Sequence, residues 1–123
     1  MISSPDAEQS PDQLLAEVHR EFRAGLADRV ETLRSALARL AGGYDRAAAD
    51  AFYRTAHTLK GTAASFEADE LVEPAAALTD LGLRWFEGGA LDPPEVDAAL
   101  RQLERLVEAI KSYRERVEGD AGG

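Results

Sequence analysis

Apolar residues recur through most of the chain at steps of three and four, the spacing of a helix that buries one face. The first run follows Ser10-Pro11-Asp12-Gln13, which has the form of a capping box with proline in the first turn, and stops at Gly42-Gly43. Gly25 lies within this run and marks a candidate kink or break. The run predicts a long first helix, whose apolar positions are Leu14, Val18, Phe22, Leu26, Val30, Leu33, Leu37 and Leu40.

Three further helices follow, each bounded by turn-forming residues. We expect the second from about Asp45 to Phe66. The third has Asp69 as its candidate N-cap and ends before Gly88-Gly89. Because Pro74 lies in its first turns, we expect the regular part of this helix to begin only there. The fourth begins at Asp92-Pro93-Pro94-Glu95, which combines a cap, a proline and a reciprocal glutamate.

The domain organisation follows from these boundaries. The chain shows no strand-like alternation, and four amphipathic helices joined by short turns predict an all-α fold, an antiparallel up-down four-helix bundle over residues 10–118. We expect residues 1–9 to form a flexible N-terminus and residues 119–123 a flexible tail. A length of 123 residues suits one domain with one core.

Composition and charge exclude several classes of function. The chain is 45% hydrophobic and 30% charged, as expected of a globular protein, and it has no cysteine for disulfides or thiolate metal sites. Its net charge of −9 argues against nucleic acid as a partner, and two widely separated histidines predict no metal site. No apolar run approaches the roughly 18 residues of a membrane span, and the first residues do not resemble a secretion signal. We therefore expect a cytoplasmic protein that does not bind membranes.

The second helix carries the most informative residues. One stripe of it is apolar and should be buried, and consists of Phe52, Ala56, Leu59, Ala63 and Phe66. His57 points about 140° away from the centre of this stripe, towards solvent. Lys60 and Gly61 follow one turn later on the same outward face, and Ala64 two turns later. His19 has no comparable neighbours, and we interpret it as a surface residue of the first helix.

This outward face is chemically unusual. A glycine in the middle of an exposed helix costs about 1 kcal/mol relative to alanine, and close approach of a partner over Gly61 and Ala64 would account for it. A neutral imidazole is a nucleophile at cytoplasmic pH. The ammonium group of Lys60, one turn away, is suited to stabilise a phosphoryl group on His57.

The stretch resembles the histidine phosphotransfer (HPt) domains of bacterial and fungal phosphorelays, whose signature reads H-x-L-K-G followed by small residues and an apolar one. His57-Thr58-Leu59-Lys60-Gly61 matches this signature, while Ala64 and Phe66 suit its small and apolar positions. The order of the four predicted helices also matches the layout of that family. Glu67 is a departure, because HPt domains usually have a glycine there, at a turn where positive φ is expected.

The resemblance implies that His57 is the phospho-acceptor and that Lys60 stabilises the phosphoryl group. It implies a response-regulator receiver domain, a histidine kinase or both as partners, with Gly61 and Ala64 in contact with the partner. No carboxylate cluster surrounds His57 in the sequence, so we expect no cofactor of its own and a Mg²⁺ ion supplied by the receiver. The chain would then be a phosphoryl carrier rather than an enzyme. Its small, mixed outward face predicts a monomer.

Other interpretations stay open. The N-terminal phosphotransfer domain of chemotaxis-type histidine kinases shares the motif, but typically has a second histidine and a glutamate on the next helix, where this chain has alanines, a leucine and Thr79. The phospho-acceptor and dimerisation domain of other histidine kinases has an acidic residue directly after the histidine and a proline soon after. Here Thr58 follows the histidine, and the next proline is Pro74. A non-catalytic helical adaptor would leave Gly61 unexplained.

Overall fold

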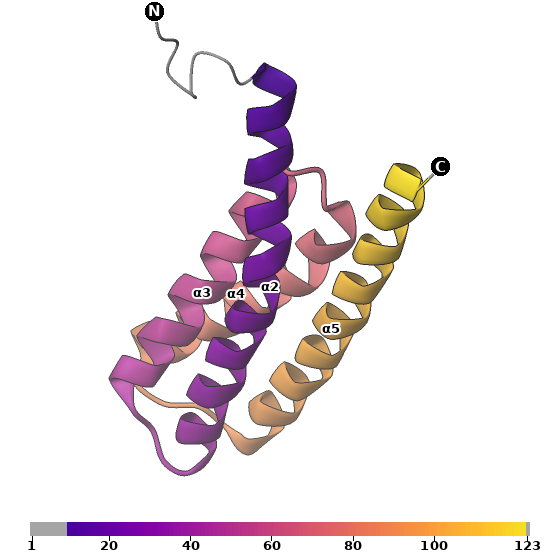
Figure 1. The fold of residues 1–123 in the computed structure, drawn as a ribbon. Helices are drawn as coiled ribbons and strands as arrows, with labels where there is room; N and C mark the ends of the chain where they lie inside the picture. The colour runs from indigo at the N-terminus through magenta and orange to yellow at the C-terminus, as the bar shows by residue number, and fades with distance from the viewer. Residues whose placement is uncertain (1–9, 123) are drawn as a thin grey trace, which may run out of the picture.

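The computed structural model describes residues 10–122, which form four α-helices and, within that range, no strand (Figure 1). Consecutive helices run in opposite directions, so the chain forms an antiparallel up-down four-helix bundle, and the predicted fold class is confirmed. Residues 1–9, predicted to be flexible, lie outside the described residues. The helices are α2 (Pro11–Ala41), α3 (Arg46–Ser65), α4 (Asp69–Gly88) and α5 (Pro93–Gly122).

Local capping fixes the helix starts that the sequence predicted. At the start of α2, the Ser10 hydroxyl accepts a hydrogen bond from the Gln13 N–H at 3.1 Å, and Gln13 Oε1 accepts one from the Ser10 N–H at 2.9 Å. This is the predicted capping box. At the start of α5, the Asp92 N–H donates to Glu95 Oε1 at 2.9 Å. Helix α2 runs through Gly25 without a break.

Two predicted helix boundaries are wrong. Helix α4 begins at Asp69, so Ala68 occupies the N-cap position and Pro74 lies inside the helix. Pro74 cannot donate a backbone hydrogen bond, and burial of Leu71, Pro74 and Ala75 in the core offsets the free-energy cost of losing it. Helix α5 continues to Gly122, so residues 119–122 of the predicted tail are helical. A single glycine costs a helix only about 1 kcal/mol, too little to end one that is already long.

The core lies along the whole bundle axis, and α3 and α4 pack most closely. Their closest approach is at Gly82, where a Cβ atom would lie 2.8 Å from the Cα atom of Tyr53. Nearby, the rings of Phe52 and Trp85 are 5.1 Å apart between centroids. The largest fully buried side chains are Trp85, Tyr113, Phe52, Leu26, Leu33, Leu40, Leu59, Leu71, Leu78 and Leu106.

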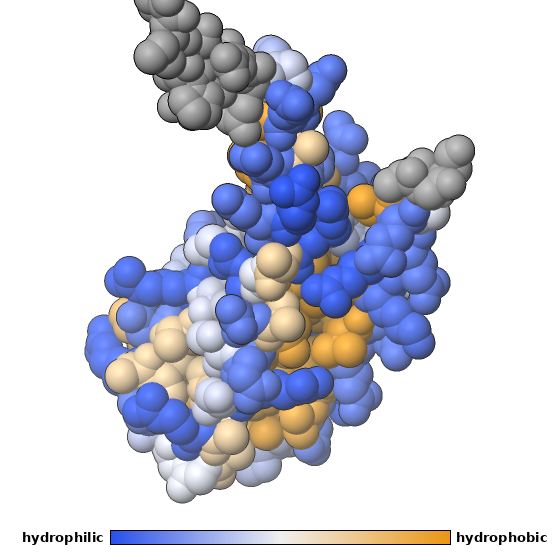
Figure 2. All heavy atoms as spheres, viewed as in Figure 1, coloured by the Kyte–Doolittle hydropathy of each residue, from blue (hydrophilic) through white to orange (hydrophobic). Residues whose placement is uncertain are grey.

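The first turns of α2 project past α3 and α4 (Figure 1). Leu14 and Val18, which the apolar spacing placed on the buried face, are therefore exposed, as is Leu15. On the side shown in Figure 2, apolar surface also gathers along the seam between α2 and α5. That seam is a groove whose apolar lining includes Val30 and Ile110.

Candidate functional site

The orientation of α3 agrees with the predicted one. Phe52, Ala56, Leu59 and Ala63 are fully buried, and Phe66 is half-buried at the end of the helix. The four predicted site residues lie exposed on the opposite side and are His57, Lys60, Gly61 and Ala64. The structure thus brings all four together on one solvent-facing surface, which we call the α3 outer face.

The start of α3 is held by Asp45. Its carboxylate accepts hydrogen bonds from the N–H groups of Ala47 at 2.9 Å and Ala48 at 3.2 Å, and it pairs with the guanidinium of Arg39 at the end of α2. The N–H of Ala48 and the charge of Arg39 hold the pKa of Asp45 below its usual value. The cap therefore fixes the helix about three turns before His57.

The imidazole of His57 stacks against the ring of Tyr53, one helical turn earlier. The two centroids are 5.7 Å apart and the ring planes differ by 24°. Side chains in a helix lean towards its N-terminus, which brings residues four apart into contact. Sequence reasoning missed Tyr53. The signal was the four-residue spacing of two rings on one helix, which favours such a contact.

Helix α3 is basic although the chain as a whole is acidic. Helix α3 carries Arg46, Arg54 and Lys60 against the single carboxylate of Asp50, while the net charge of the chain is −9. Arg54 Nε donates to Asp50 Oδ1 at 2.8 Å, and this bond raises the pKa of Arg54. No ion pair to Lys60 occurs among the side chains of residues 10–119. Its ammonium group is thus available to an anion near His57.

Gly61 leaves an open space beside the imidazole. A Cβ atom built at this position would meet nothing within 4 Å. A longer side chain at position 61 would lean back over His57, because the two positions are one turn apart. The glycine therefore keeps the approach to the imidazole clear from the side away from Tyr53.

The turn after α3 has the backbone geometry that a glycine would favour. Glu67 has φ of 57°, and it is the only non-glycine residue with positive φ between residues 10 and 122. Arg116 of α5 holds this turn: its Nη2 donates to the Glu67 carbonyl at 2.9 Å, and its guanidinium binds both carboxylate oxygens of Glu70 at 2.8 and 3.0 Å. The departure at Glu67 therefore leaves the geometry of the turn unchanged: the residue keeps a positive φ, and Arg116 of α5 holds its carbonyl.

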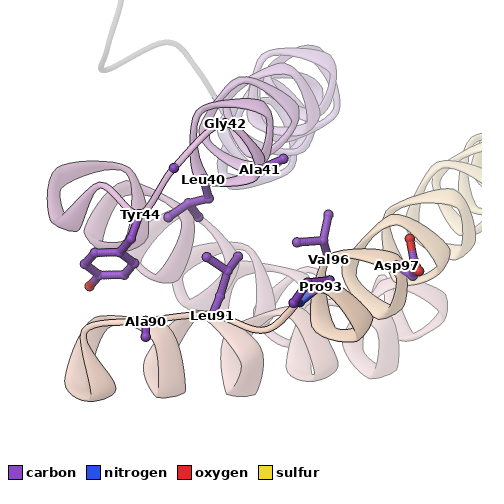
Figure 3. Close-up of a pocket in the computed structure, with 10 residues that line it drawn as sticks. Leu40, Ala41, Gly42, Tyr44, Ala90, Leu91, Pro93, Val96 and Asp97 are labelled. Carbon is purple, nitrogen blue, oxygen red and sulfur yellow. The ribbon is translucent and has the colours of Figure 1, made fainter.

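Other candidate features lie apart from this site. A hollow where the α2–α3 and α4–α5 connections meet is lined by Leu40, Tyr44, Leu91 and Val96 and contains none of the four site residues (Figure 3). His19 is half-buried, with its ring edge-on to Phe66 at 4.9 Å between centroids. Among the described side chains, those of residues 10–119, no group of three or more His, Cys, Asp or Glu could hold a metal ion. Within the same residues, no helix is both long and apolar enough to span a membrane.

The chain was compared with models of known protein families. The family model described as "Hpt domain" matches residues 12–113, most of the chain, and the chain therefore belongs to the Hpt domain family. Domains of this family carry out histidine phosphotransfer in phosphorelays, interact with kinases and receiver domains, and act as phosphocarriers rather than as classical enzymes. Searches of curated proteins and of solved structures found no match.

Proposed function

We propose that the imidazole of His57 accepts a phosphoryl group from the aspartate of a receiver domain and passes it on to another. The observation that carries this proposal is the exposed imidazole beside Lys60 and the open space at Gly61, in a chain of a phosphotransfer family. The other histidine has less access, because His19 is half-buried against Phe66.

The chemistry needs little from this chain beyond a nucleophile and a cation. A lone pair on one imidazole nitrogen attacks the phosphorus in line with the P–O bond to the partner's aspartate. A P–N bond forms as that P–O bond breaks, and the aspartate leaves as a carboxylate. The proton on the other nitrogen passes to solvent, to which His57 is open. Onward transfer reverses these steps, so the chain is a carrier.

Charge supports an acidic partner. Helix α3 carries a net positive charge, and an acidic receiver site would be attracted to it by ordinary electrostatic complementarity. We assign the Mg²⁺ ion of the reaction to that receiver, whose carboxylates would hold it. Lys60 would then stabilise the phosphoryl oxygens from the side of this chain.

Replacing His57 tests the proposal directly. After incubation with phosphorylated receiver domains, we expect acid-labile phosphate on the wild-type chain and none on His57→Gln. The fold should be unchanged, because the imidazole is exposed. His19→Gln is the matched control and should be labelled like the wild type. Labelling retained in His57→Gln would refute the proposal.

Gly61→Gln tests the approach over the α3 outer face. A glutamine would lean back over His57, so we expect transfer to slow severely while thermal stability is equal or higher. Transfer rates and melting temperatures should be measured on the same samples. Unimpaired transfer would show that the partner does not approach over this turn.

We further propose that the domain works as a monomer in the cytoplasm and meets its partners transiently. The α3 outer face mixes charged, small and polar side chains and offers no large apolar patch for a permanent partner. Light scattering at micromolar concentration should give the mass of one chain. A stable dimer would contradict this expectation and favour a kinase-like dimerisation domain.

A further inference from the structure

Tyr53 has no assigned part in the chemistry described above, yet its ring is the aromatic group against which His57 stacks. The centroid distance of 5.7 Å and the interplanar angle of 24° describe an offset stack. An exposed imidazole without such a neighbour would exchange among staggered rotamers on a nanosecond timescale. The stack therefore restricts the directions in which the ring nitrogens of His57 point.

The backbone beneath Tyr53 is itself fixed. A Cβ atom at Gly82 of α4 would lie 2.8 Å from the Tyr53 Cα atom and 3.0 Å from its nitrogen, so the two helix backbones are in direct contact here. Tyr53 is half-buried, whereas His57 is exposed. The backbone of Tyr53 is therefore fixed by α4, and its ring limits the movement of the exposed His57 side chain.

Stacking leaves the reactive atoms free. The lone pair of an imidazole nitrogen lies in the ring plane, and Tyr53 covers a face of the ring rather than its edge. The space towards Gly61 stays open. The Tyr53 hydroxyl makes no hydrogen bond to the described side chains of residues 10–119, so the aromatic ring is the part of Tyr53 that acts on His57.

We infer that Tyr53 is a positioning residue, which holds the His57 imidazole in the orientation that a docked phosphoryl donor requires. This inference rests on the proposed transfer through His57. A docked receiver presents its phosphoryl group at a fixed place, so an imidazole that is already oriented loses less freedom in the transition state. A small donor that diffuses freely has no such fixed place and gains little from the orientation.

Two variants separate the ring from the hydroxyl. Tyr53→Ala removes the stack, and Tyr53→Phe keeps it. Single-turnover transfer from a phosphorylated receiver domain, measured over a range of receiver concentrations, gives the maximal rate and the half-saturating concentration. For Tyr53→Ala we expect the maximal rate to fall by about three- to tenfold, since the two χ1 wells open to a helical residue become accessible, each with a broad, roughly two-fold χ2 distribution. The half-saturating concentration should be unchanged, and Tyr53→Phe should behave as the wild type.

Two further measurements exclude a merely structural role. Phosphorylation of His57 by phosphoramidate, a small donor, should stay within about twofold of wild type in Tyr53→Ala. The Hα–Hβ coupling constants of His57 in NMR spectra should report one rotamer in the wild type and in Tyr53→Phe, and averaged values in Tyr53→Ala. A parallel loss of phosphoramidate reactivity would indicate damage to the helix and overturn the inference.

The outcomes distinguish the two proposals. A raised half-saturating concentration with an unchanged maximal rate would make Tyr53 a docking contact instead. An equal loss in Tyr53→Phe would place the effect in the hydroxyl, and averaged couplings in the wild type would show that no orientation is held. Each of these overturns the role of Tyr53 alone. If the wild-type chain takes no phosphoryl group on His57 from a receiver, the proposed function itself fails.

Discussion

The contact between α3 and α4 at Gly82 permits a quantitative prediction for Gly82→Ala. The added Cβ atom would lie 2.8 Å from the Cα of Tyr53, and 3.0 Å from its nitrogen and from Cδ1 of Phe52. Two of these three neighbours are backbone atoms, which cannot rotate away. Ordinary contact begins at 3.4 Å, so the two helices must separate by several tenths of an ångström.

The magnitude follows from two opposing terms. Alanine is favoured over glycine inside a helix by about 1 kcal/mol, whereas forcing an extra methyl group into a packed core costs about 1–3 kcal/mol. Gly82→Ala should therefore lower the free energy of unfolding by about 0–2 kcal/mol. Gly61→Ala offers the matched control, because its Cβ would meet nothing within 4 Å. That variant should raise the free energy of unfolding by about 1 kcal/mol.

Urea unfolding followed by circular dichroism gives both values on the same scale. The difference between the two variants isolates the steric cost and should be about 1–3 kcal/mol, or on the order of 4–12 °C in Tm for a domain of this size. Equal stabilisation by both alanines would refute the reasoning, because it would show that α3 and α4 are not in backbone contact at this position.

Three further predictions concern the turn after α3, acid stability and the phosphoryl site. Glu67→Gly should raise the free energy of unfolding by up to about 1 kcal/mol in urea titrations, because glycine adopts positive φ without strain; a loss of stability would contradict this. Hydrogen bonds from Arg116 lower the pKa of Glu70, so the stability that this pair contributes is complete above the ordinary glutamate pKa near 4.3 and is lost as pH falls through and below it. Arg116→Met should therefore reduce the dependence of the urea midpoint on pH in this acidic range. An unchanged dependence would refute the assignment. Lys60→Ala should slow transfer less than Gly61→Gln does, because it removes a charge without blocking the approach, and a larger loss would reverse that order.

Much of the fold could be predicted from the sequence because its signals are local. The capping box at Ser10 and the apolar stripe of α3 each depend on residues within one or two turns, and they predicted the start of α2 and the outward direction of His57. The spacing of apolar residues could not show where α2 extends beyond α3 and α4. The spacing therefore predicted Val18 to be a core residue, although it is exposed.

The parts of the site that escaped prediction depend on contacts between helices. The register of α3 against α4 brings Gly82 onto Tyr53, and nothing in either helix alone specifies that register. Arg116 reaches a turn 49 residues earlier in the chain. The stack of Tyr53 on His57 is local, but its two residues are also compatible with separate rotamers, and only the structure shows them together.

The bracing of the Glu67 turn by Arg116 has a consequence for the evolution of this domain. A side chain at position 67 is strained by its positive φ, and a donor at position 116 compensates by binding the carbonyl of that residue. The two positions should therefore covary among relatives. In relatives with glycine at position 67, a hydrogen-bond donor at position 116 is no longer needed to hold the turn, and that position should vary. Loss of the arginine should instead favour glycine, or asparagine, as the next substitution at the turn.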